Sequence, residues 1–90
     1  MEYRHFGNTI YLRLDPKEEI LEEIGKVAEK ENIRLAQVTG LGAINDFTAG
    51  VYNTVTKEYH SIQFQGAYEI VSLTGTVTRK DGDVYLHLHI

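Results

Sequence analysis

A turn sequence followed by a strictly alternating segment constrains this chain most. Lys80-Asp81-Gly82-Asp83 contains the Asp-Gly pair that favours a two-residue hairpin turn, because both central positions of such a turn take positive φ. From Val84 to Ile90 every second residue is apolar, and a strand directs alternate side chains to opposite faces. We therefore predict an antiparallel hairpin in which Thr74–Thr78 pairs with Val84–Ile90.

The polar face of this last strand carries a His-x-His pair. Val84, Leu86, Leu88 and Ile90 form the apolar face, whereas Tyr85, His87 and His89 form the other. Neutral imidazole is a common metal ligand, and two imidazoles roughly 6–7 Å apart along a strand suit the start of a zinc site. The alternative is that both histidines only make hydrogen bonds on a surface facing solvent or another subunit.

A metal site needs at least a third ligand. The other candidates are His5, His60, Asp46, Glu58 and Glu69, and no spacing in the sequence places any of them beside the pair. The sequence therefore predicts two metal ligands, His87 and His89, and an incomplete ligand set.

The first third of the chain predicts one strand and one helix. Asn8 to Leu14 alternates apolar and polar residues, as a strand does. Asp15 then suits the N-cap, Pro16 the first helical position and Glu18 a capping box, and Asn32 suits the C-terminal stop. The apolar stripe of this helix comprises Ile20, Leu21, Ile24, Val27 and Ala28, and its solvated face comprises Glu18, Glu19, Glu22, Glu23, Lys26 and Lys30.

The remainder of the chain predicts a sheet. Residues 33–39, 47–52, 58–64, 66–77 and 84–90 are five candidate strands, and the glycines of Gly40-Leu41-Gly42 break or bulge the first of them. The Gly-Leu-Gly segment does not fit a phosphate-binding loop, because no helix pattern follows it. The predicted fold class is α+β, a mostly antiparallel sheet with one main helix packed on it, in a single domain of residues 1–90.

Composition and charge narrow the function classes. Formal net charge is −4, with 13 acidic and 9 basic residues, which disfavours a large phosphate-binding face without excluding nucleic acid altogether. The sequence has no cysteine, so disulfides and thiolate metal sites are excluded. No apolar run has the length of a signal peptide or a membrane span, so we expect a cytoplasmic protein without a membrane partner.

Several segments resemble the plants and prokaryotes conserved (PPC) domain family. The most specific are GAYEIVSLTGTV (residues 66–77) and YLHLHI (residues 85–90). YRHFGNTIYLRLDPKEEILEEI (residues 3–24) is similar to the opening strand and helix of the family, and VTGLGAINDFTAGVYN (residues 38–53) to its Gly-x-Gly-Ala segment. The resemblance runs through the whole chain in the family's order.

This resemblance implies an antiparallel sheet with a packed helix, assembled as a homotrimer. Prokaryotic members of the family carry a metal, zinc by expectation, on histidines, and His87 and His89 match the family's His-x-His. The family's third histidine lies in a Gly-Gly-His segment beyond the residues of this chain, together with closing strands. The sequence has no AT-hook motif, so the way in which plant members of the family reach the minor groove of DNA is not expected of this chain.

Three functions from different classes remain open. The first is an oligomeric, zinc-binding module for assembly or partner recognition. The second is a DNA-binding or DNA-associated regulator, as family members are described. The third, a zinc-dependent enzyme, is the weakest because the sequence supplies neither a third ligand nor a general base.

Overall fold

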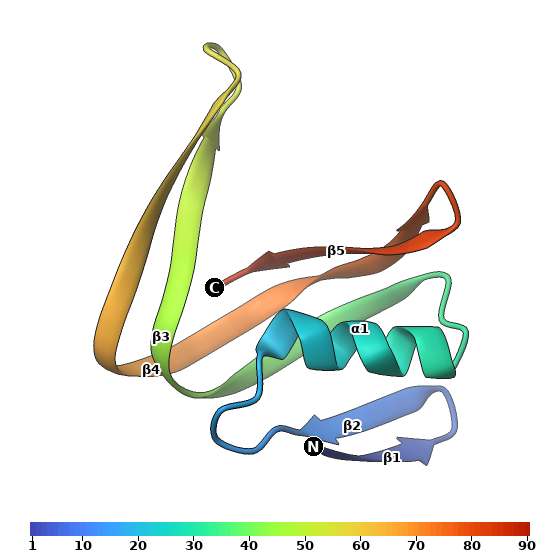
Figure 1. Ribbon diagram of the computed structural model, residues 1–90. Helices are drawn as coiled ribbons and strands as arrows, with labels where there is room; N and C mark the ends of the chain where they lie inside the picture. Colours follow the sequence, from blue (N-terminus) through green and yellow to red (C-terminus); the bar gives the residue numbers. More distant parts are fainter. The chain divides into compact units, whose positions relative to one another are not determined.

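The chain begins with a two-stranded antiparallel hairpin. In this computed structural model, which describes residues 1–90, β1 (Glu2–Phe6) pairs with β2 (Thr9–Arg13), so that Glu2 lies opposite Arg13 and Phe6 opposite Thr9 (Figure 1). Gly7 has φ 60° and makes the turn. The predicted strand at Asn8–Leu14 is confirmed as β2, whereas β1 was not predicted.

Helix α1 (Ile20–Lys30) begins later than predicted. Its N-cap is Glu19, whose side chain accepts a hydrogen bond of 2.7 Å from the main-chain N of Glu22. The prediction of Asp15 as N-cap was wrong because Lys17, at φ 76°, prevents the helix from starting there. Asp15 and Glu18 instead close a separate turn through hydrogen bonds of 2.6 and 3.2 Å.

The helix ends where the sequence predicts. Asn32 adopts φ 51°, and the main-chain N atoms of Asn32 and Ile33 donate to the main-chain O atoms of Glu29 and Ala28. This is the Schellman arrangement, which satisfies carbonyls of the last turn. The apolar stripe is confirmed only in part, because Leu21 is exposed whereas Glu23, predicted on the solvated face, is 7% exposed.

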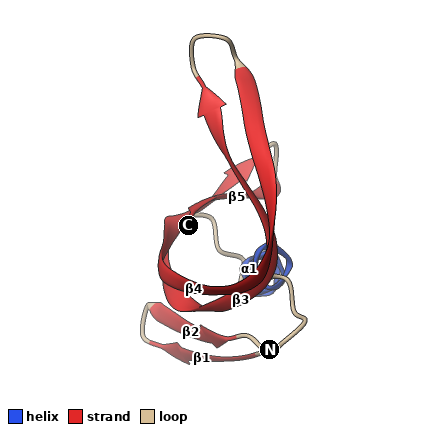
Figure 2. Cartoon of the chain, turned by 90° about the vertical axis from the view of Figure 1, so that its left-hand side faces the viewer, coloured by secondary structure: helices blue, strands red, loops and turns tan.

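Three strands follow the helix and form a sheet in the order β3-β4-β5. They are β3 (Ala36–Asn53), β4 (Glu58–Lys80) and β5 (Asp83–His89), and Figure 2 shows β3 and β4 as continuous strands. The prediction of five separate strands was wrong because pairing continues through Gly42 (φ 147°) and Gly66 (φ 136°). The α+β class, with one helix and antiparallel sheets, is confirmed.

The chain divides into two compact units. We call residues 1–36 and 76–87 the helical unit, and residues 37–75 and 88–90 the hairpin unit. Val27, Ala28 and Val77 are buried in the helical unit, and Ile70 and Leu73 are buried in the hairpin unit. The only helix of the chain, α1, is too short and too polar to cross a lipid bilayer.

Candidate functional site

Strand β5 presents the His-x-His pair as the sequence predicts. Asp81 and Gly82 have φ values of 52° and 87°, which form the tight turn between β4 and β5. Along β5 exposure alternates, so that His87 and His89 are exposed while the intervening Leu88 is half-buried. Ile90, predicted on the apolar face, is 53% exposed.

The structure does not bring a third metal ligand to this pair. No group of three or more His, Asp or Glu side chains lies close enough together to hold a metal ion. His5 contacts Glu31 instead, with 3.4 Å between Nδ1 and Oε1, and Asp46 accepts a hydrogen bond of 3.1 Å from Gln63. Within one chain, the donors present therefore fit part of a metal site and do not complete it.

The adjacent basic residues Arg79 and Lys80 do not form a phosphate-binding patch. The guanidinium of Arg79, whose side chain is 17% exposed, donates to the main-chain O atoms of Ile33, Ala28 and Gly82 at 3.0–3.3 Å. The Lys80 ammonium lies 5.6 Å from the centre of the Tyr85 ring. The side chain of Arg79 therefore serves the internal packing of the helical unit.

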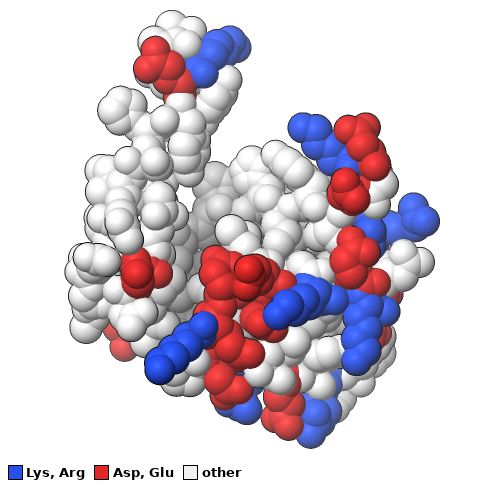
Figure 3. Space-filling model, in the orientation of Figure 1, with Lys and Arg blue, Asp and Glu red and all other residues white.

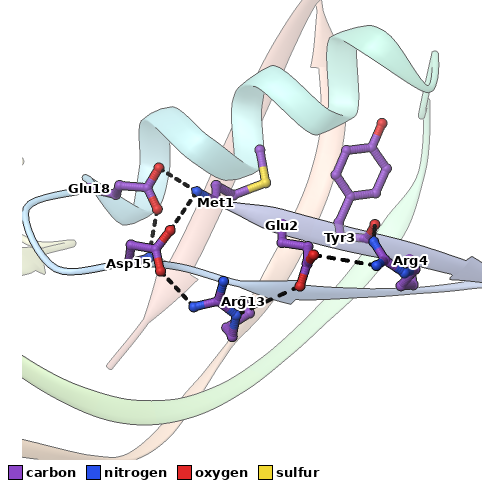
Figure 4. Close-up of polar contacts among 7 residues, drawn as sticks. All are labelled: Met1, Glu2, Tyr3, Arg4, Arg13, Asp15 and Glu18. Carbon is purple, nitrogen blue, oxygen red and sulfur yellow. Dashed lines mark hydrogen bonds and ion pairs between the residues drawn. The ribbon is translucent and has the colours of Figure 1, made fainter.

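An ion-pair network joins the start of the chain to the turn before α1. The N-terminal ammonium of Met1 lies 3.0 Å from Asp15 and 2.8 Å from Glu18, and Arg13 contacts Asp15 at 2.6 Å (Figure 4). Hydrogen bonds from this ammonium lower the pKa of the Asp15 and Glu18 carboxyls, and those same bonds, the one to Glu18 foremost, raise the pKa of the ammonium. The Met1 ammonium and the Arg13 guanidinium are thus both paired with carboxylates of the same chain.

The Gly-Leu-Gly segment lies inside β3, as the non-phosphate interpretation predicts. A Cβ atom at Gly40 would lie 3.7 Å from the side chain of Leu73 on β4, which is ordinary packing distance. The segment therefore belongs to the sheet of the hairpin unit and does not form a phosphate-binding loop.

The hairpin unit contains an open groove that the sequence analysis missed. Its volume is about 290 Å³, and one wall is aromatic: the rings of Phe47 and Phe64 stack at 5.1 Å, and Tyr68 meets Phe47 edge-on at 5.4 Å. Glu69 and Ile90 also line it. Counting outward from the turn at residues 54–57 would have placed Phe47 opposite Phe64, so the signal lay in the hairpin register.

The hairpin unit is also poor in charge and rich in exposed apolar side chains. It holds four of the chain's 22 charged residues, Asp46, Lys57, Glu58 and Glu69. On the face drawn in Figure 3, the β3–β4 hairpin is mostly white below a red and blue group at its outer end. Exposed apolar residues of this unit include Leu41 (85%), Val51 (73%), Val55 (87%), Tyr59 (62%), Ile62 (61%) and Val71 (91%). Exposed apolar side chains that gather on one unit of a chain in this way indicate an interaction surface.

Comparisons with known proteins agree on one family. The chain matches the family described as the Plants and Prokaryotes Conserved (PCC) domain over residues 1–90, and a search of curated proteins finds no match. A solved candidate DNA-binding protein from Bacteroides thetaiotaomicron has a TM-score of 0.93 and 31% identity, covering 99% of this chain and 62% of that chain.

Two archaeal structures are also similar. A plant- and prokaryote-conserved protein from Pyrococcus horikoshii has a TM-score of 0.80 and 35% identity, covering 86% of this chain and 54% of that one. A metal-containing protein from Archaeoglobus fulgidus has a TM-score of 0.82 and 31% identity, covering 86% of this chain and 55% of that one. The chain thus spans between 54% and 62% of the length of these three structures.

Proposed function

Because this chain belongs to the Plants and Prokaryotes Conserved domain family, we propose that it acts as a self-assembling module, a homotrimer, that binds zinc through His87 and His89. The observation that carries this proposal is the nearly uncharged, apolar surface of the hairpin unit. Leu41, Val55 and Val71 of this unit are 85–91% exposed, whereas most of the charged residues belong to the other unit, and an apolar surface of this kind favours burial against another molecule.

The free energy gained by burying the exposed apolar side chains is comparable with the free-energy cost of association. Burying one fully exposed Val, Leu or Ile contributes about 1.5–3 kcal/mol, so the five exposed aliphatic side chains named above contribute roughly 8–15 kcal/mol together. Association costs about 4–15 kcal/mol in lost translational and rotational freedom. The apolar side chains of the hairpin unit must therefore be buried together, as in a ring of copies, for the assembly to be stable.

The zinc part of the proposal is supported by the alternation along β5 and by the metal-containing relative from Archaeoglobus fulgidus. Two imidazoles per chain leave the ligand set incomplete, since structural zinc takes four ligands and catalytic zinc at least three from protein. A second copy would supply the remaining ligands in an assembly. A zinc-dependent enzyme remains the third function class, and the general base that it needs has no candidate here.

DNA binding is the second candidate function, and the relative from Bacteroides thetaiotaomicron supports it. Electrostatics weigh against it, because Arg4, Arg13, Lys26 and Arg79 are each paired with a carboxylate. A gel shift with duplex DNA at low salt tests it, since phosphate contacts are strongest there. A shift that weakens as salt rises would establish DNA binding, and its absence at micromolar protein would exclude it.

The assembly is tested by light scattering on the purified chain. We expect a trimer mass for the wild type, and a shift toward monomer for Leu41→Asp and Ile62→Asp, because each puts a charge into the apolar surface of the hairpin unit. Leu35→Asp is the matched control, since Leu35 is 79% exposed but belongs to the helical unit. A monomeric wild type at working concentration would overturn the proposal.

A further inference from the structure

The tip of the β3–β4 hairpin carries an apolar residue where a turn is ordinarily polar. Val55 lies between two threonines and is 87% exposed. The side chain of Asn53 holds this turn, because its Oδ1 accepts hydrogen bonds from the main-chain N atoms of Val55 at 2.9 Å and Thr56 at 3.1 Å. The main-chain N of Lys57 donates to the main-chain O of Asn53 at 2.8 Å. A well-fixed turn thus presents one aliphatic side chain to the outside.

The groove of the same unit is complementary to this tip. Its volume of about 290 Å³ is at the lower limit for pockets that enclose small ligands, and it accommodates an aliphatic side chain against Phe47, Phe64 and Tyr68. Branched aliphatic groups pack well on aromatic faces, and both surfaces would lose water on contact.

The charges at the two surfaces allow one ion pair between copies. Lys57, two residues from Val55, is the one Lys or Arg of the hairpin unit, and Glu58 follows it at the start of β4. Glu69 is the only charged residue that lines the groove. Neither side chain has an ion-pair partner within the chain.

A chain cannot fill its own groove with its own tip. Asn53 lies six residue steps along the extended strand from Phe47, and at the usual rise this is about 20 Å. The occupant that matches the groove in apolar character and charge is therefore the tip of another copy.

We propose that Val55 of one copy inserts into the groove of a neighbouring copy, with Lys57 facing Glu69 at the groove margin. This inference rests on the proposed self-assembly and specifies its contact. Tip and groove are different surfaces, so the contact is head-to-tail, and such contacts form a closed ring, of three copies for example, when the rotation between copies closes.

The test uses the full chain and sedimentation equilibrium. Val55→Asp is expected to raise the dissociation constant of the assembly at least about 100-fold, because a carboxylate would enter an apolar groove. Thr54→Asp is the matched control, since it adds the same charge beside Val55 on the same exposed turn, and is expected to change the constant less than about fivefold. Circular dichroism of each variant confirms that the sheet is retained.

Exchanging the charges of Lys57 and Glu69 tests whether these two residues pair between copies. Lys57→Glu and Glu69→Lys alone should each weaken assembly about fivefold, and the double variant should recover it. If the wild type assembles and Leu41→Asp dissociates it, but Val55→Asp and Thr54→Asp behave alike, the inserted tip is overturned while self-assembly stands. A small molecule or unrelated protein occupying the groove would give that same result. A monomeric wild type would overturn both.

Discussion

Arg79 and Ala28 lie 51 residues apart in the sequence, and Nη2 of Arg79 donates a hydrogen bond of 3.3 Å to the main-chain O of Ala28. That oxygen also accepts a bond of 2.9 Å from the main-chain N of Ile33, which closes the C-terminus of α1. Because Nη1 of Arg79 reaches the main-chain O of Gly82 at 3.2 Å, one guanidinium joins the end of the helix to the β4–β5 turn. The planar fork of arginine suits several carbonyls at once.

Arg79→Ala should therefore be strongly destabilising. The substitution removes hydrogen bonds to the main-chain O atoms of Ala28, Ile33 and Gly82, although the main-chain N of Ile33 still donates to Ala28. We expect the free energy of unfolding to fall by about 2–4 kcal/mol in urea titrations. The loss of stability for Arg79→Lys should lie between zero and that for Arg79→Ala, since one ammonium cannot donate to several carbonyls as the planar guanidinium does. Arg13→Ala is the control, because the Arg13 side chain is 64% exposed and solvent screens its ion pairs, so we expect a much smaller loss of stability. Equal losses for the two alanine variants would contradict this role of Arg79.

Two glycines should respond to the same substitution with opposite signs. A Cβ at Gly50 would collide with the main-chain O of His60 and lie 2.9 Å from Cα of Ser61 on the paired strand, so Gly50→Ala should cost about 1–3 kcal/mol. Gly25 lies inside α1 with nothing within 4 Å of its added Cβ. Gly25→Ala should raise the free energy of unfolding by about 0.5–1 kcal/mol, because alanine loses less entropy in a helix. Thermal unfolding of both variants measures the change in stability. A change in the same direction for Gly50→Ala and Gly25→Ala would contradict this prediction.

Features fixed by neighbouring residues could be predicted from the sequence. The Asp81-Gly82 turn, the alternation of β5 and the stop at Asn32 each depend on a few adjacent residues, and all three are present in the structure. The family resemblance, which depends on several segments in order, is confirmed by the match over residues 1–90.

Features that depend on contacts between distant segments could not be predicted in the same way. Strand β1 has little apolar alternation of its own and forms because it pairs with β2. Glu23 is buried although its position in the sequence repeat looked solvated, with the Lys26 ammonium 3.1 Å from its Oε1. Whether His87 and His89 find a third ligand depends in the same way on contacts that no local pattern encodes.

The N-terminal ion-pair network predicts a stability profile with two limbs. The lowered pKa of Glu18 means that its contribution is present above the ordinary carboxyl pKa of about 4 and is lost as pH falls through the lower folded value. The raised pKa of the Met1 ammonium means that its contribution is present below about pH 8 and is lost as pH rises through the higher folded value.

Glu18→Gln should consequently lower the melting temperature of the 90-residue chain most between about pH 5 and 7.5, with a smaller difference from wild type at pH 3 and at pH 10. Glu58→Gln serves as control, because Glu58 lies in the hairpin unit and has no contact with the ammonium. Scanning calorimetry across this range measures the difference, and a gap between wild type and Glu18→Gln that does not change with pH would refute the linkage.

Zinc content provides the test of the His-x-His pair. If His87 and His89 are two of the ligands, His87→Ala and His89→Ala should each reduce zinc per chain, measured by elemental analysis after dialysis against excess zinc, and the double variant should retain essentially none. His60→Ala is the control, since His60 lies in β4 near the hairpin turn. Because one chain supplies an incomplete ligand set, Leu41→Asp should also lose zinc if neighbouring copies complete the site. Equal zinc in the wild type and the double variant would remove His87 and His89 from the site, and zinc bound fully by a monomeric Leu41→Asp variant would show that one chain suffices.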